Sequence, residues 1–357
     1  MLQSIFLQRP SDIVAAPIRV LIVDDSAVVR AALSRIVADA PEFEVAAALD
    51  GARRAIDWLA TSSVDVILLD VQMPGLNGIA ALPELVAASG GAHILIVSML
   101  AGDGARATIQ ALALGAADTL AKPETAAMGR QFGDVLINKM LRLGKAKPAA
   151  FVEICEPLPL RRAVDMPVAC LAIGASTGGL HALKDFFEAL PKDFDVPILV
   201  TQHLPPVFMS FFADQLCTLS GRPTYVARSG QVIQRGEILV APGERHLSLS
   251  RAGSITKTML LDHAVPSRCC PSVDPMFSSV GDVFGSSAVG VVLTGMGRDG
   301  KVGAGAMVAA GGTVIVQDAV SSTIWGMPGS VARAGLASLI ASPAELADYV
   351  VQRGVAR

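Results

Sequence analysis

The feature that most constrains this chain is the alternation of short apolar runs with longer amphipathic segments. Five such runs, IRVLIV, FEVAAA, DVILL, HILIV and ADTLA, occur between residues 18 and 121, and a segment with helical spacing follows each of them. Strands that each lead into a helix pair in parallel and are covered by helices on both faces of the sheet. Residues 18–142 are therefore predicted to form one α/β domain.

A second series of strands and helices occupies residues 167–357. PVACLAIG, VPILVT and AVGVVLT each lead into a helical segment, and a further run, GTVIV, follows. The pieces TYVA, EILVA, HLSLS and SITKTMLL between them are predicted to be β-hairpins inserted into this layout. We expect a doubly wound, mostly parallel α/β domain. Residues 143–166, which hold three prolines and no clear period, are expected to be a linker, and residues 1–17 a short flexible extension.

Composition excludes several classes of protein. Hydrophobic residues make up 52% of the chain, which rules out a disordered protein. No run supplies the ~20 apolar residues of a spanning helix, and the N-terminus lacks the features of a secretory signal. Five cysteines without C-x-x-C spacing favour reduced thiols in the cytoplasm. With 32 acidic and 29 basic groups and no basic half, we expect no nucleic-acid partner and no direct membrane insertion.

Polar side chains follow the strands of the N-terminal half. Asp24 and Asp25 come after IRVLIV, Asp70 after DVILL, Ser98 after HILIV, and Lys122 after the fifth run. The carboxyl ends of parallel strands meet at one edge, where three carboxylates would repel one another unless a hard cation such as Mg²⁺ were bound. One carboxylate could then accept a phosphoryl group, with the metal and the lysine balancing its charge. The alternative for any single aspartate is a helix cap.

This half resembles the receiver domain of two-component response regulators. The resemblance rests on VDD at 23–25, LLDVQMPGLNG at 68–78, VS at 97–98 and AKP at 121–123. It implies a flavodoxin-like (βα)5 fold and phosphorylation of Asp70 by a partner histidine kinase. It also implies Mg²⁺ on Asp24, Asp25 and Asp70, with Ser98 and Lys122 responding to the phosphoryl group. Asn77 stands where aspartate is common before the glycine.

A glycine-rich turn opens the second half of the chain. GASTGG at 174–179 fits G-x-S-x-G, in which small residues permit a sharp turn that exposes Ser176 at a helix N-terminus. Helix-terminal N–H groups can stabilise an oxyanion there. Alone, the motif is weak, because the same turn could hold a nucleotide phosphate, although it lacks the lysine of a P-loop.

Two further strand ends could complete a catalytic triad. His203 follows VPILVT, and Asp299 follows AVGVVLT on a flexible turn. A serine nucleophile needs a base within hydrogen-bond reach, and that base needs an orienting carboxylate. Each residue could instead be structural. The weaker alternatives are His93, His181, His246 and His263 for the base, and Asp262, Asp274 and Asp318 for the carboxylate.

The order Ser…His…Asp differs from that of ordinary α/β-hydrolases. With GASTGG, QHLP, APGERH, PSVDPMF, LTGMGRDG and QDAVSSTIWGMP in this order, the second half resembles the chemotaxis-type protein-glutamate methylesterase (CheB-like) domain. The resemblance implies hydrolysis of γ-glutamyl methyl esters on chemoreceptor cytoplasmic helices, with release of methanol, and deamidation of particular receptor glutamines. Ser176 would be the nucleophile, His203 the base and Asp299 its orienting group, with Thr177 and Met296 as candidate oxyanion donors and no cofactor.

The combination of a receiver with a hydrolase suggests regulation. We expect the unphosphorylated receiver to cover the Ser176 site, and phosphorylation of Asp70 to favour an open arrangement. Two rival hypotheses are a non-enzymatic signalling adaptor and a nucleotide-binding output domain. The stretch Arg268-Cys269-Cys270 departs from the basic, histidine-containing sequence expected of the family, so substrate contacts there should differ.

Overall fold

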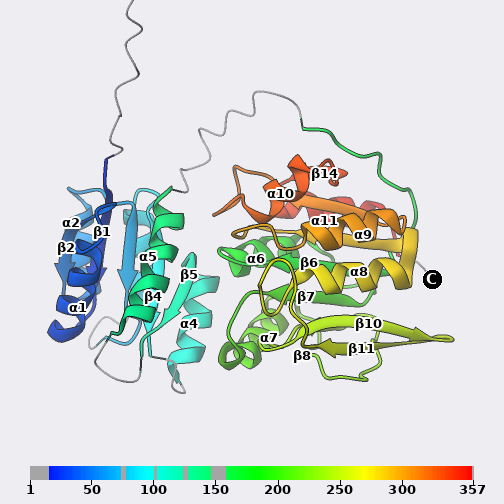
Figure 1. The fold of residues 1–357 in the computed structure, drawn as a ribbon, viewed down its shortest axis with the longest axis horizontal. Coiled ribbons are helices and arrows are strands. Elements are labelled where there is room, and N and C mark those ends of the chain that lie inside the picture. Colours follow the sequence, from blue (N-terminus) through cyan, green and yellow to red (C-terminus); the bar gives the residue numbers. More distant parts are fainter. Residues whose placement is uncertain (1–15, 74–77, 100–102, 124–127, 146–157, 356–357) are drawn as a thin grey trace, which may run out of the picture.

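The computed structural model describes residues 16–73, 78–99, 103–123, 128–145 and 158–355. Residues 1–15, Asn77 and half of the expected linker (146–157) lie outside this part of the chain. The described residues form two α/β domains that lie side by side (Figure 1). The N-terminal domain, called the receiver below after the resemblance of its sequence, contributes one five-stranded sheet, and the C-terminal domain contributes a seven-stranded sheet and a two-stranded hairpin.

The N-terminal sheet has the strand order β2-β1-β3-β4-β5, and every pair is parallel. This is the flavodoxin-like (βα)5 arrangement that the sequence predicts. The strands are β1 (Ile18–Val23), β2 (Phe43–Leu49), β3 (Val66–Leu69), β4 (His93–Ser98) and β5 (Asp118–Ala121). The helices are α1 (Ala27–Ala38), α2 (Ala52–Leu59), α3 (Gly78–Ala88), α4 (Asp103–Ala113) and α5 (Arg130–Lys145).

Alternating side chains of each central strand enter different cores. Val20 and Ile22 of β1 belong to one buried apolar cluster, whereas Leu21 and Val23 belong to the other. The sheet is therefore covered on both faces, as continuous apolar strands require. Helix α5 continues three residues past the expected domain end at 142, because Leu143 is buried in the core beneath it.

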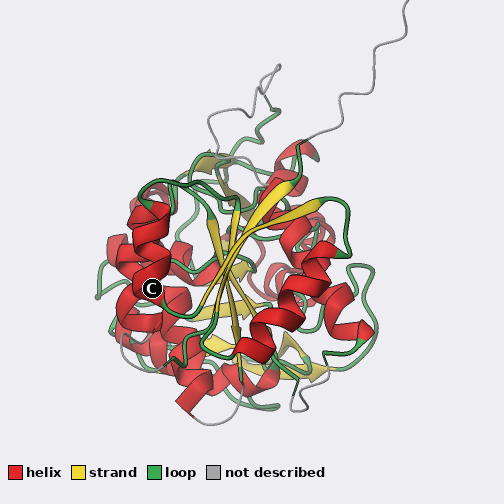
Figure 2. Cartoon of the chain, turned by 90° about the vertical axis from the view of Figure 1, so that its left-hand side faces the viewer, coloured by secondary structure: helices red, strands yellow, loops and turns green. Residues whose placement is uncertain are grey.

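The C-terminal sheet has the order β14-β13-β12-β6-β7-β9-β8, again with parallel pairs throughout. Figure 2, viewed from the side of the N-terminal domain, shows the strands of the molecule crossing its middle with helices around them. The strands are β6 (Cys170–Ala175), β7 (Ile198–Gln202), β8 (Thr224–Val226), β9 (Ile238–Val240), β12 (Ala288–Val292), β13 (Thr313–Gln317) and β14 (Leu339–Ala341). The helices are α6 (Gly179–Ala189), α7 (Pro206–Ser220), α8 (Val273–Phe284), α9 (Lys301–Ala309), α10 (Met327–Arg333) and α11 (Pro343–Gln352).

The inserted region is only partly made of hairpins. The two later pieces form the expected antiparallel hairpin, β10 (His246–Ala252) and β11 (Ile255–Leu261). The prediction was wrong for TYVA and EILVA, because β8 and β9 instead add to the edge of the main sheet as parallel strands. The physical reason is that Ile238 and Val240 are fully buried, and the sheet beside β7 buries them better than an isolated hairpin would.

The end of the expected linker packs on the C-terminal domain. The Arg161 N–H donates to the Ala337 carbonyl at 2.8 Å, and the Arg353 guanidinium donates to the Met166 carbonyl at 2.9 Å. These contacts join residues that precede β6 to residues near the end of the C-terminal domain. Among the helices of the described residues, none is long and apolar enough to cross a membrane.

The two domains share an extensive contact. Helix α4 of the receiver packs against α6 and α7 (Figure 1). The Arg106 guanidinium lies 5.3 Å from the centre of the Phe211 ring, a cation–π contact. The Gly178 N–H donates to the Ala117 carbonyl at 2.7 Å, which joins the receiver directly to the serine turn. The receiver therefore lies over the edge of the C-terminal sheet that carries Ser176.

Candidate active site

Three neighbouring strand ends bring the predicted triad together. Strand β6 lies between β7 and β12, and Ser176 is the first residue after β6. The Ser176 N–H donates to the Thr294 carbonyl at 3.0 Å, and the His203 N–H donates to the Ala175 carbonyl at 3.2 Å. These bonds continue the ladders past the strands proper, so the polar residues that follow each strand emerge at one edge.

The serine turn exposes one residue of a buried stretch. Ser176 is half-buried, whereas the residues from Leu171 to Ala175 and from Thr177 to Leu180 are buried. Gly178 adopts a φ of +76°, which glycine reaches without strain, and α6 begins at the next residue. Gln202, which the sequence did not single out, donates its side-chain N–H to the Ser176 carbonyl at 2.8 Å. Hydrogen bonds to its backbone thus hold the turn, and the Ser176 hydroxyl forms no hydrogen bond with any described residue.

His203 and Asp299 form a direct pair. The Nε2 atom of His203 lies 2.8 Å from Oδ2 of Asp299. Because this nitrogen faces the carboxylate, Nδ1 is the ring nitrogen left to accept a proton from a serine. Ser176, His203 and Asp299 all line one cavity of about 590 Å³. The structure therefore brings together the three residues that the sequence singled out.

Asp299 is held by more than the imidazole. Its side chain is fully buried and also accepts hydrogen bonds from Ser272 Oγ at 2.6 Å and from the Val273 N–H at 2.7 Å. Burial opposes its ionisation, but the His203 contact and these donors outweigh burial and lower the pKa of Asp299 to about 2. Ser272 and Val273 belong to PSVDPMF, a block that marked the family but gave no role for these residues.

A second buried carboxyl lies beside the first. Burial, together with the charge of Asp299, raises the pKa of Asp274 to about 6, while the Gly303 N–H donates to its Oδ1 at 2.8 Å. Because Asp299 ionises first, between about pH 2 and 6 the pair carries one negative charge, on the group that faces His203, and Asp274 ionises only as the pH rises through about 6. Asp274 is therefore not the orienting carboxylate, although it was one alternative.

The imidazole is strongly basic in this setting. Burial lowers the pKa of His203, but the hydrogen bond to Asp299 and the neighbouring Cys269 outweigh burial and raise it to about 9. An imidazole can accept a proton from serine only when it is neutral. The fraction of His203 ready to act as a base therefore increases with pH up to about 9.

The two candidate oxyanion donors lie at the same cavity. Thr177 and Met296 both line it, and neither of their backbone N–H groups donates a hydrogen bond to a described residue. By contrast, the N–H groups of Ser176, Gly178 and Gly179 are all engaged by carbonyls. A phosphate-binding turn needs free N–H groups, so this engagement disfavours the nucleotide-binding alternative.

The receiver forms part of the cavity wall. Asp118, Asn138, Lys139 and Arg142 of β5 and α5 line it together with the triad. Thr177 Oγ1 donates to Oδ2 of Asp118 at 2.9 Å, and Lys139 forms an ion pair with the same carboxylate at 2.7 Å. The Arg142 guanidinium contacts the sulfur of Met296. Both candidate oxyanion residues are thus touched by the receiver.

The acidic cluster of the receiver is also assembled. Carboxylate oxygens of Asp24, Asp25 and Asp70 lie within 4.8 Å of one another. Lys122 bridges two of them, with Nζ 2.7 Å from Oδ2 of Asp24 and a contact to Asp70. Ser98 Oγ is buried and has no hydrogen-bond partner among the described residues. Burial raises the pKa of Asp70, against the opposing effect of Lys122.

These donors fit a hard divalent cation and a phosphoryl group. Three carboxylates supply the oxygen ligands that Mg²⁺ prefers, and Asp25 is exposed, which leaves room for bound water. The unpartnered hydroxyl of Ser98 is suited to a phosphoryl oxygen, and Lys122 can balance the charge of the phosphoryl group. The five receiver residues predicted from the strand ends therefore lie at one edge of the sheet.

The remaining histidines and aspartates do not compete for these roles. His93 lies on β4 and His181 on α6, while neither Asp262 nor Asp318 is among the described residues that line the cavity of the triad. His246 contacts the triad only indirectly, through Ser272. Its Nδ1 accepts the Ser272 N–H at 3.0 Å, and its Nε2 contacts the His263 carbonyl at 2.9 Å. It supports the serine that hydrogen-bonds Asp299.

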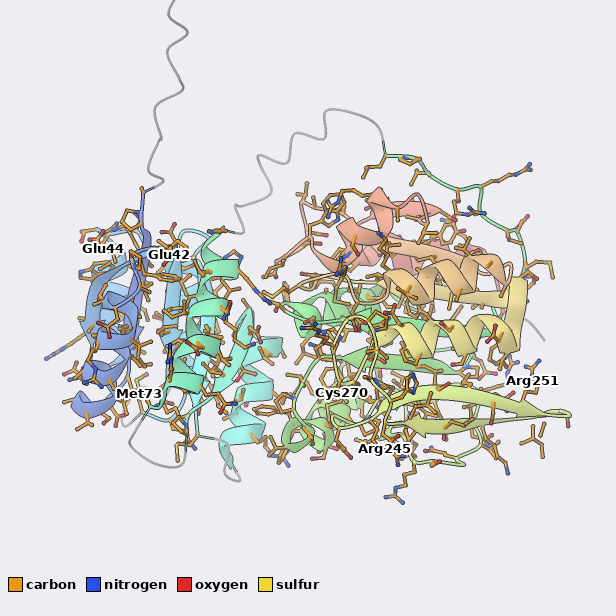
Figure 3. The ribbon with its side chains drawn as sticks, in the orientation of Figure 1. Glu42, Glu44, Met73, Arg245, Arg251 and Cys270 are labelled. Atoms are coloured by element: carbon orange, nitrogen blue, oxygen red, sulfur yellow. The ribbon has the colours of Figure 1, made fainter. Side chains whose placement is uncertain are left out.

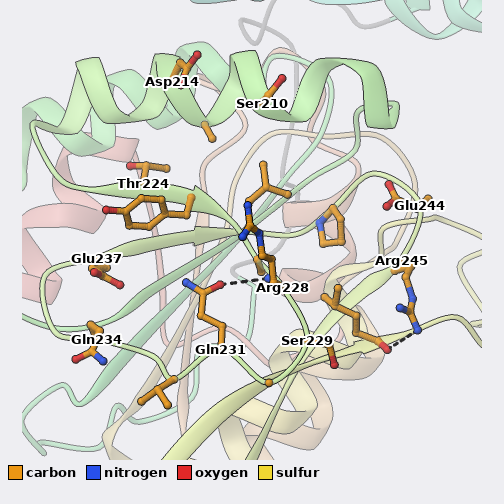
Figure 4. Close-up of a pocket in the computed structure, with 18 residues that line it drawn as sticks. Ser210, Asp214, Thr224, Arg228, Ser229, Gln231, Gln234, Glu237, Glu244 and Arg245 are labelled. Carbon is orange, nitrogen blue, oxygen red and sulfur yellow. Dashed lines mark hydrogen bonds between the residues drawn. The ribbon is translucent and has the colours of Figure 1, made fainter.

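A larger cavity, of about 1270 Å³, lies between α7, β8 and the turn after it (Figure 4). Its polar lining includes Ser210, Arg228, Glu237 and Arg245, and the Gln231 side chain accepts the Arg228 N–H at 3.2 Å. Among the described residues, no histidine or cysteine lines it, and none lines both this cavity and that of Ser176. It therefore offers its serines no imidazole base from the described residues.

Comparison with known proteins agrees with this geometry. The family profile described as CheB methylesterase matches residues 171–350, and that of the response regulator receiver domain matches residues 20–131. The catalytic domain of Thermotoga maritima CheB methylesterase covers 52% of this chain and 99% of its own, with 32% identity and a TM-score of 0.50.

Curated relatives extend the match over nearly the whole chain. A protein-glutamate methylesterase/protein-glutamine glutaminase 2 of Caulobacter vibrioides is 40% identical over 94% of this chain and 98% of its own length. The protein-glutamate methylesterase/protein-glutamine glutaminase of Nitrobacter hamburgensis is 37% identical over 94% of both. With a receiver and a hydrolase site in the same order and over the same length, this chain belongs to the CheB family of protein-glutamate methylesterases.

Proposed function

We propose that this chain removes methyl groups from γ-glutamyl methyl esters on the cytoplasmic helices of chemoreceptors, and that it deamidates particular receptor glutamines. One observation carries the proposal: Ser176 shares a cavity with His203, whose ring is paired at 2.8 Å with the fully buried Asp299. Such substrates place the enzyme in the cytoplasm. The family membership of the chain supports both the substrate class and the reaction.

The mechanism follows from the pairings of His203. Neutral His203 accepts the Ser176 Oγ proton on Nδ1 as the oxygen attacks the ester carbonyl, while Asp299 holds Nε2–H. The Thr177 and Met296 N–H groups donate to the oxyanion. The imidazolium then protonates the departing methoxide, which leaves as methanol. Water repeats the cycle on the acyl-serine and releases the glutamate and the free serine; with a glutamine substrate the leaving group is ammonia.

The direct test is to offer the full chain a methylated receptor helix fragment and to measure methanol. We expect methanol release that increases with a small phosphoryl donor and Mg²⁺, and ammonia release from the corresponding glutamine fragment. A non-enzymatic adaptor would bind the fragment and release neither product. Binding of ATP or a dinucleotide, measured by calorimetry, would instead favour the nucleotide-binding alternative.

Activity should increase steeply with pH. Because His203 has a pKa of about 9 and must be neutral to act as the base, kcat/KM should rise roughly tenfold between about pH 7 and 8, less steeply up to about 9, and then level off. Asp299, with a pKa of about 2, stays ionised throughout this range. The measurement is kcat/KM for methanol release from the phosphodonor-treated enzyme across this range. A profile that is flat from pH 7 upward would contradict the assigned base.

Phosphorylation of Asp70 by the histidine kinase of a chemosensory system would favour an arrangement in which the receiver no longer covers the Ser176 site. Bound Mg²⁺ would neutralise charge on the incoming phosphoryl group, with Asp24, Asp25 and Asp70 as its ligands. Lys122 follows β5, and Asp118 at the start of that strand contacts Thr177 beside the nucleophile. Strand β5 spans roughly 13 Å. A displacement of Lys122 at one end of the strand can therefore displace Asp118 at the other end, where it contacts Thr177.

Loss of the Asp118 contact should mimic part of this activation. Asp118→Ala removes the acceptor of Thr177 and the ion-pair partner of Lys139. Since such contacts are each worth about 1 kcal/mol, methanol release without phosphoryl donor should rise about fivefold. Asp70→Asn is the matched comparison: it should keep the basal rate and lose stimulation by the donor. If Asp118→Ala leaves the basal rate unchanged, this contact does not hold the closed arrangement.

A further inference from the structure

Cys269, which no step of the proposed hydrolysis uses, lies against the imidazole of His203. Its Sγ, a ring nitrogen of His203 and a carboxylate oxygen of Asp299 all lie within 4.8 Å of one another. Cys269 also lines the cavity that contains Ser176. The loop before α8 supplies it, at the stretch where this chain departs from the sequence expected of its family; the adjacent Cys270 is labelled in Figure 3.

We propose that His203, Cys269 and Asp299 bind Zn²⁺ and that the bound ion blocks ester hydrolysis. Nitrogen, sulfur and oxygen donors together are typical of zinc sites, and three protein ligands leave a fourth position for water. Tetrahedral bonds of about 2.0–2.3 Å place donor atoms roughly 3.5 Å apart, so the widest separation allowed here, 4.8 Å, needs a contraction of about 1.3 Å. The hydrogen bond between His203 Nε2 and Asp299 Oδ2, now 2.8 Å, has to open by about 0.7 Å. Mg²⁺ prefers oxygen ligands and would not compete.

The surroundings already support two of the ligands. Asp299 is oriented by Ser272 Oγ at 2.6 Å and by the Val273 N–H at 2.7 Å, so its carboxylate need not be ordered on binding. The Cys269 backbone N–H donates to Ser267 Oγ at 3.4 Å, which holds the loop, whereas the thiol gives up its hydrogen bond to the Ser267 carbonyl, 3.7 Å away, when it binds the ion as a thiolate. Hydrogen bonds that orient a ligand, such as those to Asp299, strengthen metal sites. His203 and Cys269 are half-buried, so the cavity gives an ion access to them.

Occupation of this site excludes catalysis for a chemical reason. A neutral imidazole has one ring nitrogen with a free lone pair, and once that pair is given to the ion none remains for the proton of Ser176. Binding also transfers the thiol proton of Cys269, and any second proton of His203, to the solvent. No electron is exchanged, so a chelator should reverse the inhibition completely.

The binding test uses the full chain with excess Mg²⁺, which keeps the cluster at Asp24, Asp25 and Asp70 occupied. Zn²⁺ is titrated by calorimetry at about pH 8, where thiol ionisation is easier, and Co²⁺ is used to detect a thiolate charge-transfer band. Wild type and Cys270→Ser should bind one ion tightly and show the band. Cys269→Ser should bind at least ~10-fold more weakly and lack the band.

Two results would overturn the metal site: equal binding by wild type and Cys269→Ser, or equal loss in Cys269→Ser and Cys270→Ser. The second result would assign the ion to the cysteine pair instead. A measurement on the wild type alone guards against a misfolded variant. Zn²⁺ should slow alkylation of Cys269, identified by peptide mapping, and unchanged alkylation would count against the site.

The inhibition arm rests on the proposed esterase activity, whereas the binding arm does not. Methanol release by wild type and Cys270→Ser should fall on addition of Zn²⁺ and return with a chelator, while Cys269→Ser should keep the same rate with and without the ion. Binding that depends on Cys269 but leaves the rate unchanged would refute the inhibition. If no variant hydrolyses the ester while zinc binding still depends on Cys269, the proposed function fails and the metal site stands.

Discussion

Replacing Ser176 with alanine should lower kcat/KM for methanol release by ~10³-fold or more. The substitution removes the hydroxyl oxygen that forms the acyl intermediate, and the neighbouring Thr177 hydroxyl is already donated to Asp118. Because its hydroxyl forms no hydrogen bond with any described residue, and the turn is held by the Ser176 carbonyl and N–H, the fold should be unaffected. A residual rate is expected, since the oxyanion donors and the cavity would remain.

The measurement is methanol release from the methylated receptor fragment, with and without phosphoryl donor. Ser210→Ala is a matched control, because Ser210 lines the second cavity (Figure 4), and no described residue lines both that cavity and the one of Ser176. The control should retain the wild-type rate. Full activity of Ser176→Ala would rule out the serine mechanism and leave the adaptor hypothesis, under which no variant of this turn should matter.

Asp299→Asn should reduce kcat by about 10⁴-fold, the effect known for the orienting aspartate of serine proteases. The carboxylate accepts Nε2–H and thereby leaves Nδ1 free as the base. An asparagine can present an N–H to the same nitrogen, which would favour the wrong tautomer of His203. The substitution also removes the buried charge that opposes deprotonation of the ring.

The pH profile distinguishes this role from simple misfolding. Without the charge of Asp299, the pKa of His203 should fall below its wild-type value of about 9, so the remaining activity should reach its plateau at lower pH. Asparagine cannot satisfy both Ser272 Oγ and the Val273 N–H as the carboxylate does, and the protein should lose about 1–3 kcal/mol of stability. A slow variant with an unshifted profile would show that Asp299 does not act through the imidazole.

Much of the site could be predicted because parallel strands impose a rule on sequence. Polar residues that directly follow buried strands must emerge at one edge, which is why the amino-acid sequence suffices to group Ser176 with His203, and likewise Asp24 with Asp70. The rule fails where chain segments add to a sheet out of sequence order. Strands β8 and β9 pair in parallel across an intervening turn, and nothing in TYVA or EILVA distinguishes that pairing from a hairpin.

The sequence by itself determined the two α/β domains, the residues at each strand end and the family, because periodicity and motif spacing are local properties of the chain. The tertiary structure alone decided which side chains meet across long separations. Ser272 reaches Asp299 over 27 residues, Asp118 reaches Thr177 over 59, and Cys269 lies against His203, each through loops whose paths no period records. These contacts influence the pKa of His203 and make the receiver part of the cavity wall, since electrostatic and packing energies depend on distance in space.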